Sequence, residues 1–409
     1  MTEILRFPGS GPPSADVHEQ RFAVSFDYPV VFTRDVFALE NRQLLDILDR
    51  RREGRRHRVA VCIDSGVAAA QPALVSRIKA YFHAHQASIE LAGAPEIVPG
   101  GEACKEDWTA VKELMVAFGN LHLDRQSFVL VIGGGSVLDM VGFATALVHR
   151  GLRLVRLPTT VLAQNDAGVG VKNGMNEHGV KNFLGTFAPP FAVIDDFTFL
   201  ATLPHEHWLG GVAEAFKVAI IKDRAFFEFL AREAAAIRGR HLGAMEELIR
   251  RAAVLHLEHI AGNGDPFELG TARPLDFGHW SAHKLEAMSG FRISHGFAVG
   301  AGVALDSFYA AQKGLLTSVE LERILGAIST CGLRLWFPEM DERNASGERV
   351  LLAGLEEFRE HLGGRLTITL PDGIGSKLEV HHLDIGDLED GFSLLRAREE
   401  RAQSARTVG

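Results

Sequence analysis

The chain is poor in cysteine and has no long apolar run. Its three cysteines (Cys62, Cys104 and Cys331) are widely spaced and form no CxxC pair. Such a set offers neither a disulfide framework nor a thiolate metal site, and it favours a reducing compartment. No apolar run is long enough to span a bilayer, and the Gly-, Pro- and Ser-rich start has no core of signal-peptide length. We therefore expect a cytoplasmic protein without membrane contact, with a flexible N-terminal arm over residues 1–21.

Positive charge is also scarce. The chain has 43 Lys and Arg against 52 Asp and Glu, a net charge of −9. This balance argues against a nucleic-acid or membrane-surface binder, so an anionic ligand would need cations gathered locally. With 409 residues, 46% of them hydrophobic, the chain exceeds the roughly 250–300 residues of a single core, and two domains are expected.

The pattern of apolar residues changes along the chain. Residues 22–203 alternate short apolar segments, expected as strands, with helical segments, which indicates βαβ units and a largely parallel sheet. Residues 204–394 carry helical spacing almost throughout, and the polar tail 395–409 is expected to be frayed. The predicted fold is an α/β N-terminal domain followed by an all-α C-terminal domain. Expected strands are 22–28, 28–33, 58–67, 87–94, 127–135 and 153–160, and expected helices include 39–54, 73–86, 107–121 and 137–151.

The segment VIGGGSVLDMVGF (131–143) is typical of a strand end, a glycine turn and a helix start. A dinucleotide fingerprint needs a third glycine for helix packing, and Leu138 occupies that slot here. The exposed N–H groups of such a turn still form an anion site, and Asp64, at the end of an earlier strand, can accept ribose hydroxyls. The motif alone leaves open a dinucleotide, a bare phosphate or no ligand at all.

Residues 159–187 contain five glycines and two Lys-Asn pairs, Lys172-Asn173 and Lys181-Asn182. The glycines exclude a regular helix throughout, so a long loop is expected. Lysine ammonium and asparagine amide groups are donors that suit phosphate and hydroxyl groups. The alternative is a solvated surface loop with ordinary lysines.

Candidate metal ligands occur in the second half. Glu214 and Lys217 are three residues apart on one predicted helix, His279 and His283 are four apart, and His295 precedes a glycine. A carboxylate with two or three imidazoles suits Zn²⁺ with open positions for substrate oxygens. Spacing makes His279 and His283 an attractive pair but does not choose the ligands, because some clustering among 18 histidines arises by chance.

Taken in chain order, the glycine turn, the Lys-Asn pairs and the candidate metal ligands resemble the sugar phosphate cyclase superfamily, whose best-known member is 3-dehydroquinate synthase. The resemblance is colinear over roughly residues 22–385. It implies an N-terminal domain that binds NAD, a C-terminal domain that binds Zn²⁺ or Co²⁺, and an active site between them. The matching segments are PGGEACK (99–105), GGGSVLDMVGF (133–143), HRG (149–151), PTT (158–160), DAGVGVKNGMN (166–176), KN (181–182), 202–217, FGHWSAH (277–283) and HG (295–296).

The resemblance also implies residue roles. Glu214, His279 and His295 correspond to the metal ligands, and His283 to a substrate or proton-relay contact. Asp166, Lys172 and Lys181 are assigned to both cofactor and substrate. The other NAD contacts are Asp64, Glu102, Lys105, Gly134, Gly135, Ser136, Asp139, Thr159 and Thr160, and the other substrate or phosphate contacts are Arg150, Asn182 and Lys217.

The implied reaction converts a seven-carbon ketose phosphate to a carbocyclic ketone. Its steps are transient oxidation by NAD, phosphate elimination, reduction and intramolecular aldol closure. The family suggests a homodimer.

The sequence departs from dehydroquinate synthases near the first histidine. Asp276 stands where they carry Asn, Ala272 stands where they carry Arg with Arg273 next to it, and no lysine occurs between Lys222 and Lys284. We expect these missing cations to bind a substrate carboxylate in dehydroquinate synthases, so the site here suits a substrate with a neutral polyol end. Asp276 and Arg273 are candidate catalytic residues.

The branch within the superfamily stays open. The Asp-Ala-Gly-Val-Gly phrase is similar to cyclases of sedoheptulose 7-phosphate, but those lack the second histidine, retained here as His283. EboD-type homologues are a third branch. Outside the superfamily, the alternative is a metal-dependent polyol or alcohol dehydrogenase of the glycerol dehydrogenase type, which shares the fold and the GGGS turn. Those enzymes typically begin the metal set with Asp, whereas this chain has Glu214.

Overall fold

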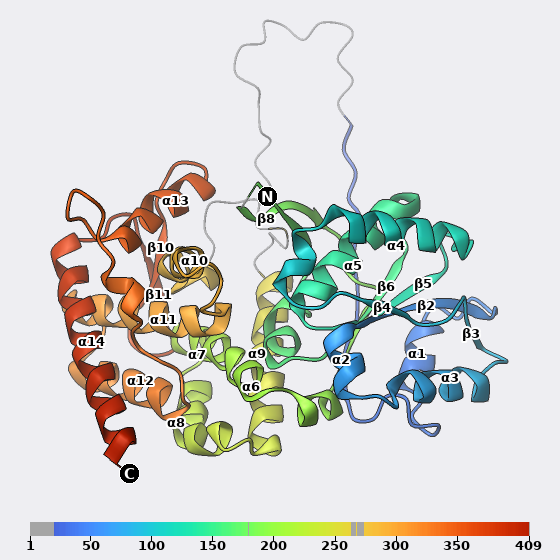
Figure 1. The fold of residues 1–409 in the computed structure, drawn as a ribbon, viewed down its shortest axis with the longest axis horizontal. Helices are drawn as coiled ribbons and strands as arrows, with labels where there is room; N and C mark the ends of the chain where they lie inside the picture. The colour runs from blue at the N-terminus through green and yellow to red at the C-terminus, as the bar shows by residue number, and fades with distance from the viewer. Residues whose placement is uncertain (1–19, 179, 263–266, 268–273, 409) are drawn as a thin grey trace, which may run out of the picture.

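The computed structural model describes residues 20–178, 180–262, 267 and 274–408. The chain forms two lobes side by side, a sheet lobe from the N-terminal half and a helical lobe from the C-terminal half (Figure 1). The last strand of the large sheet ends at Asp196, and the first helix of the second lobe begins at His205. Among the described helices, none combines the length and apolarity needed to cross a membrane.

The sheet lobe is built on one parallel sheet, as the sequence predicts. The strand order is β1-β9-β6-β5-β2, and both β3 and β4 pair with the far side of β2. All six residues of β5 are buried, as expected for a central strand covered on both faces. The strands are β1 (Val30–Thr33), β2 (His57–Asp64), β3 (Ile89–Leu91), β4 (Glu96–Val98), β5 (Phe128–Gly133), β6 (Arg153–Pro158) and β9 (Ala192–Asp196).

Helices cover both faces of this sheet. Because side chains alternate along a strand, Leu130 of β5 packs toward α1 (Gln43–Leu48) and α3 (Leu74–Ala84), while Val131 packs toward α4 (Trp108–Asn120) and α5 (Gly135–Leu147). The chain runs from β2 outward to β3 and β4, then returns to β5 on the other side. Ligands of open α/β sheets bind at such a switch point, here the carboxyl ends of β2 and β5.

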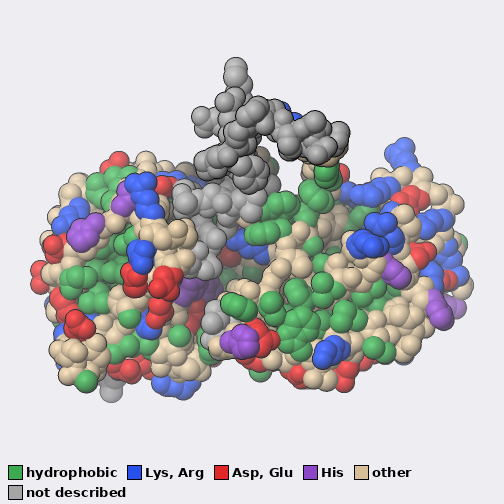
Figure 2. Space-filling view, turned by 90° about the horizontal axis from the view of Figure 1, so that it is seen from above, with side chains coloured by type: hydrophobic (Ala, Val, Ile, Leu, Met, Phe, Trp, Pro, Cys, Tyr) green, Lys and Arg blue, Asp and Glu red, His purple; other side chains and the backbone are tan. Residues whose placement is uncertain are grey.

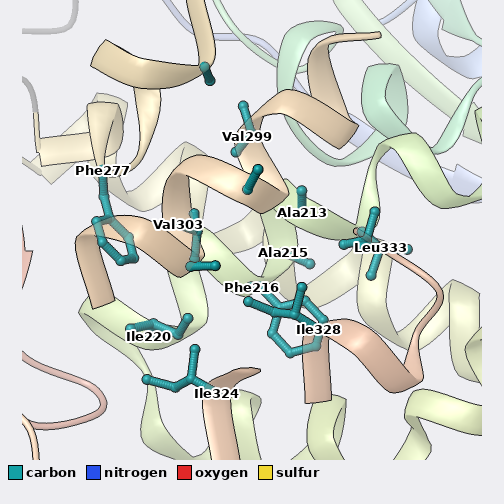
Figure 3. Packing of buried hydrophobic residues seen from close by; sticks show 14 of the residues in the cluster. Ala213, Ala215, Phe216, Ile220, Phe277, Val299, Val303, Ile324, Ile328 and Leu333 are labelled. Carbon is teal, nitrogen blue, oxygen red and sulfur yellow. The ribbon is translucent and has the colours of Figure 1, made fainter. Parts of the chain in front are cut away.

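The second lobe packs its helices around α7 and α11, which are buried over most of their length. Figure 3 shows Phe216 of α7, Val299 and Val303 of α11, and Ile324 and Ile328 of α12 meeting in this core. The helices are α6 (His205–Gly210), α7 (Val212–Lys222), α8 (Arg224–Arg238), α9 (Leu242–Gly262), α10 (His279–Met288), α11 (His295–Gln312), α12 (Ser318–Thr330), α13 (Ala353–His361) and α14 (Ile385–Val408).

Short helical turns complete both lobes. They are α2 (Ser65–Ala70), η1 (Glu102–Lys105), η2 (Val148–Arg150), η3 (Ala163–Ala167), η4 (Phe197–Thr202), η5 (Pro274–Asp276), η6 (Pro338–Asp341) and η7 (Val350–Leu352).

Two predictions for the sheet lobe are wrong. Residues 22–28 form no strand, and Phe22, Val24 and Phe26 are exposed instead of pairing with the sheet. The predicted loop 159–187 contains an antiparallel hairpin, β7 (Lys172–Glu177) and β8 (Val180–Phe187). The buried Arg156 holds the start of this hairpin by donating hydrogen bonds to the Lys172 carbonyl and the Asn173 side chain. This tertiary contact leaves no local sequence signal.

The C-terminal predictions also need correction. The helical lobe carries a small antiparallel hairpin, β10 (Ile368–Pro371) and β11 (Lys377–Val380), so it is not wholly helical. The tail predicted to be frayed belongs to α14, because Phe392 and Leu395 are buried in the core of the lobe. Further along α14, the buried Glu399 accepts a hydrogen bond from the backbone N–H of Leu335. The arm predicted for residues 1–21 lies almost entirely outside the described residues.

Candidate functional site

The predicted site residues gather where the two lobes meet. Figure 2 shows histidine and basic side chains beside the junction of the two lobes. Side-chain contacts between described residues cross from lobe to lobe there. His256 Nδ1 lies 2.9 Å and Lys217 Nζ 4.0 Å from Asp166 Oδ1, and Lys181 Nζ donates to Glu286 Oε1 at 2.7 Å. The site is therefore shared between both halves of the chain.

Three side chains of the helical lobe converge on one point. Glu214 lies on α7, His279 begins α10, and His295 begins α11. Glu214 Oε1 is 3.0 Å from His295 Nε2 and 3.7 Å from His279 Nε2, and the three donor atoms lie within 4.8 Å of one another. Ligands about 2.05 Å from a tetrahedral Zn²⁺ are about 3.3 Å apart. The geometry therefore fits one divalent ion held by these three residues.

Both imidazoles are oriented by a partner on the other ring nitrogen. His279 Nδ1 lies 3.1 Å from the Phe277 carbonyl, and His295 Nδ1 lies 2.9 Å from Glu286 Oε2. Gly278, which precedes His279, has a φ of +78°, and a Cβ there would lie 2.6 Å from the backbone N of Val303 on α11. Only glycine allows α10 to begin this close to α11, the helix that begins with His295.

A buried ion pair completes the centre. Lys217 Nζ lies 2.5 Å from Glu214 Oε2. Burial opposes ionisation of Glu214, but Lys217 and the two imidazoles hold its pKa well below its usual range. Burial likewise acts to lower the pKa of Lys217, and the carboxylates of Glu214 and Asp166 raise it above its usual value. Lys217 is therefore a cation and Glu214 a carboxylate.

A second group, His283, Glu286 and His295, also brings three donor atoms together. Glu286, however, already binds His295 Nδ1 with one oxygen and the Lys181 ammonium with the other. Both oxygens of Glu286 are therefore occupied, whereas Oε1 of Glu214 faces the Nε2 atoms of His279 and His295. The structure therefore favours the first set, and it pairs His279 with His295 rather than with His283. The exposed His283 ring lies beside them, 5.3 Å from the His279 ring and 6.0 Å from the His295 ring between centroids.

The glycine turn lies at the switch point of the sheet. Helix α5 begins at Gly135, and Gly134 before it has no side chain to cap the exposed N–H groups. Asp64 stands beside the turn, since a Cβ on Gly133 would lie 3.1 Å from Asp64 Cβ. Within the described part of the chain, the buried Thr159 hydroxyl has no hydrogen-bond partner. Unpaired donors and a carboxylate here fit the pyrophosphate and ribose of a dinucleotide.

Four further predicted cofactor residues form one network at the start of α5. Ser136 Oγ donates to Glu102 Oε2 at 2.6 Å, and Lys105 Nζ donates to Asp139 Oδ2 at 2.7 Å. Lys105 also donates to Asn182 Oδ1, which ties the hairpin to the glycine turn. The glycine turn itself lies beside the segment that carries Asp166, because a Cβ on Gly135 would lie 3.6 Å from Cβ of Ala167, the residue after Asp166.

The other predicted residues differ in their position relative to this cluster. Arg150 is exposed just beyond the far end of α5, away from the glycine turn, in a left-handed conformation with a φ of 63°. Lys172 is exposed at the first residue of β7. Thr160 lies beside the glycine turn, since a Cβ on Gly134 would lie 3.3 Å from Thr160 Cγ2, and its Oγ1 accepts a hydrogen bond from the backbone N–H of Ala163. Asp276, in η5, is close enough to contribute to the raised pKa of Lys217. Arg273 lies outside the described residues.

Two residues of the site escaped prediction. His256 on α9 lies 2.9 Å from Asp166 through its Nδ1, and no local spacing around it indicates a site. Glu286 had a usable signal, because His279, His283 and Glu286 recur at i, i+4 and i+7 and so share one face of α10.

Comparison with known proteins decides the family. Residues 96–210 match the model described as 3-dehydroquinate synthase N-terminal, and residues 211–348 match 3-dehydroquinate synthase C-terminal. The chain belongs to the 3-dehydroquinate synthase family.

Relatives match most of the chain. A 2-epi-5-epi-valiolone synthase of Actinoplanes sp. is 33% identical over 92% of this chain and 93% of its own length. A 3-dehydroquinate synthase of Caulobacter vibrioides is 33% identical over 81% of this chain and 87% of its own. The structure of the 2-epi-5-epi-valiolone synthase ValA of Streptomyces hygroscopicus subsp. jinggangensis 5008, with NAD⁺ and Zn²⁺ bound, superposes with a TM-score of 0.81 at 29% identity, covering 93% of this chain and 100% of that one.

Proposed function

We propose that this protein is a sugar phosphate cyclase that uses NAD and a divalent metal ion to convert a seven-carbon ketose phosphate to a carbocyclic ketone, with elimination of phosphate. The proposal rests on the contact between two parts of the site, the candidate metal ligands of the helical lobe and the glycine-turn region of the sheet lobe. The Glu214, His279 and His295 cluster of the helical lobe reaches the glycine-turn region through the contact of Lys217 with Asp166. A reaction that needs a metal and a nicotinamide over one substrate requires this arrangement.

The residues fit the groups they would hold. Glu214, His279 and His295 would bind Zn²⁺ or Co²⁺, and Asp64, Thr159 and the glycine turn, with the Glu102, Lys105 and Asp139 network, would bind NAD. When bound, the metal supplies Lewis acidity toward a substrate hydroxyl, and NAD supplies reversible hydride transfer.

The chain's own side chains supply charge and proton transfer. Lys217 lies between the carboxylates of Asp166 and Glu214 and provides a fixed positive charge for substrate oxygens that become negative during the reaction. The exposed His283 ring beside the metal cluster is positioned to accept a proton from the substrate. Lys172, Lys181 and Asn182 of the β7–β8 hairpin provide donors for the phosphate that leaves.

The substrate end opposite the phosphate is proposed to be neutral. Near Lys217 the described site offers carboxylates, Asp166 and Asp276, and His256 in contact with Asp166. Carboxylates accept hydrogen bonds from hydroxyls and repel a substrate carboxylate. Similarity to 2-epi-5-epi-valiolone synthases supports the same choice, so sedoheptulose 7-phosphate is the proposed substrate.

We also propose that the protein is a cytoplasmic homodimer. Arg150 is exposed beyond the far end of α5, so it can take part in phosphate binding only if a second copy brings it to a site. Exposed Phe22, Val24 and Phe26 offer apolar surface for such a contact.

The test is incubation of the protein, loaded with Zn²⁺ and NAD, with sedoheptulose 7-phosphate and separately with the seven-carbon acid phosphate used by dehydroquinate synthases. A cyclase releases inorganic phosphate without net NADH, and we expect release from the neutral sugar. Accumulation of NADH would favour the dehydrogenase alternative, and release from the acid alone would contradict the proposed substrate.

A further inference from the structure

Glu286 is a buried acid whose two oxygens both have partners. The side chain lies on α10 with 3% exposure. Its Oε2 is 2.9 Å from His295 Nδ1, and its Oε1 accepts a hydrogen bond from Lys181 Nζ at 2.7 Å. It touches neither Glu214 nor His279 in the described contacts, so it acts through His295.

The two histidines of the metal cluster differ in what orients them. His279 Nδ1 faces a backbone carbonyl, which the fold holds in place, whereas His295 Nδ1 faces a side-chain carboxylate. A carboxylate on the outer nitrogen fixes the ring, sets the tautomer that leaves Nε2 free for a metal, and makes Nε2 a better donor. Replacing the carboxylate would therefore weaken metal binding by His295 while leaving the histidine itself in place.

Glu286 is in turn held from the other lobe. Lys181 lies on β8 of the hairpin in the sheet lobe, and Glu286 lies on α10 of the helical lobe. A carboxylate this deeply buried needs a cation to compensate its charge, and the Lys181 ammonium lies 2.7 Å from its Oε1. A continuous chain of contacts, Lys181 to Glu286 to His295, thus crosses the lobe interface.

We propose that Glu286 is the positioning residue of the metal centre, and that it fixes His295 for metal binding while Lys181 holds it from the opposite lobe. This inference rests on the proposed function only in taking Glu214, His279 and His295 as the metal ligands. It is independent of the substrate.

The test is the affinity of the full-length protein for Zn²⁺, measured by competition with a chromophoric chelator. Glu286→Gln should bind Zn²⁺ about 10–100-fold more weakly than the wild type, as for other carboxylates behind a histidine ligand. The matched control is Glu246→Gln, because Glu246 is also buried and also accepts an ion pair across the lobes, from Arg34 Nη2 at 2.6 Å, with no contact to a metal candidate. The control should bind Zn²⁺ as the wild type does. Equal affinity of Glu286→Gln and the wild type would overturn the proposal, as would equal losses in both variants.

The wild type provides a second readout that does not depend on the folding of the variant. In long-range ¹H–¹⁵N spectra of the Zn²⁺-loaded protein, with His295 assigned by comparison with His295→Gln, the proton should reside on Nδ1 and the metal on Nε2. Metal on Nδ1 would contradict a role for Glu286. Because both experiments read metal binding, weak Zn²⁺ binding by Glu286→Gln in a protein that cyclises no sugar phosphate would uphold this inference and reject only the proposed function.

Discussion

Lys217 Nζ lies 2.5 Å from one oxygen of Glu214, while the other oxygen of that carboxylate faces two imidazoles. Glu214 thus connects the Lys217 ammonium to a group of side chains whose geometry fits a metal ion. The arrangement explains how a buried carboxylate is stable before any metal binds, since Lys217 supplies the compensating charge.

Lys217→Met should make folding depend on metal. The substitution keeps most of the volume but leaves Glu214 buried without its cation, so the free energy of unfolding of the metal-free protein should fall by about 3 kcal/mol. Zn²⁺ should restore more stability to the variant than it adds to the wild type, because it neutralises the same carboxylate. Urea unfolding with and without Zn²⁺ measures both effects. Equal gains from Zn²⁺ in the two proteins would show that Lys217 does not serve Glu214.

The two histidines beside His279 should behave differently. His295→Ala should reduce Zn²⁺ affinity by more than the ~10–100-fold typical of an outer partner, because a ligand itself is lost. His283→Ala should retain Zn²⁺ and lose turnover. Metal content after dialysis, together with phosphate release, distinguishes them. If His283→Ala loses the metal and His295→Ala keeps it, the assignment of Glu214, His279 and His295 as the metal ligands is wrong.

Lys172→Ala should raise the KM for the phosphorylated sugar about tenfold or more, since a hydrogen bond from a charged donor contributes roughly 1.5–3 kcal/mol. Lys112→Ala is the matched control, because Lys112 is an exposed lysine of the same lobe on α4. Initial rates of phosphate release over a range of sugar concentrations give both values. An unchanged KM in Lys172→Ala removes this residue from the phosphate site.

Asp306 should make stability fall as pH rises. Burial raises the pKa of Asp306 to about 7, although hydrogen bonds from Trp280 and the Gly278 N–H oppose the shift. Between about pH 4 and pH 7 the folded state keeps a proton that the unfolded state loses, so this group lowers stability by at most about 1.4 kcal/mol per pH unit. The dependence ends above the folded pKa.

Asp306→Asn removes this titration. The unfolding free energy of the variant relative to the wild type should therefore rise from pH 5 to pH 7 and level off above it, whatever the offset at pH 5. Denaturant unfolding at several pH values measures the difference. A pH-independent difference would mean that Asp306 is ionised throughout this range.

The sequence predicts those features that local pattern controls. Alternating apolar segments indicate the parallel sheet, and the glycine run at Gly133 places a turn that the structure puts beside Asp64. The β7–β8 hairpin escaped because its order depends on Arg156, buried beneath it and distant in sequence from most of its residues. His256 escaped for a similar reason, since only the packing of α9 against η3 brings it to Asp166.

Local sequence pattern also did not suffice to decide which histidines are the metal ligands. Helical spacing favours His279 with His283, but the ligand geometry depends on Glu214 and His295, which come from two other helices. Spacing reports which side chains share a helix face, and it carries no information about which helix lies opposite. Resemblance to the family supplied that assignment.

The most direct test of the account is a crystal structure with Zn²⁺ and NAD⁺, using anomalous scattering at the zinc edge. We expect one zinc peak about 2.0–2.2 Å from Glu214, His279 and His295, with the pyrophosphate on the turn at Gly134 and the nicotinamide facing the metal. A peak on His283 and Glu286 instead, or a dinucleotide bound away from the glycine turn, would contradict it.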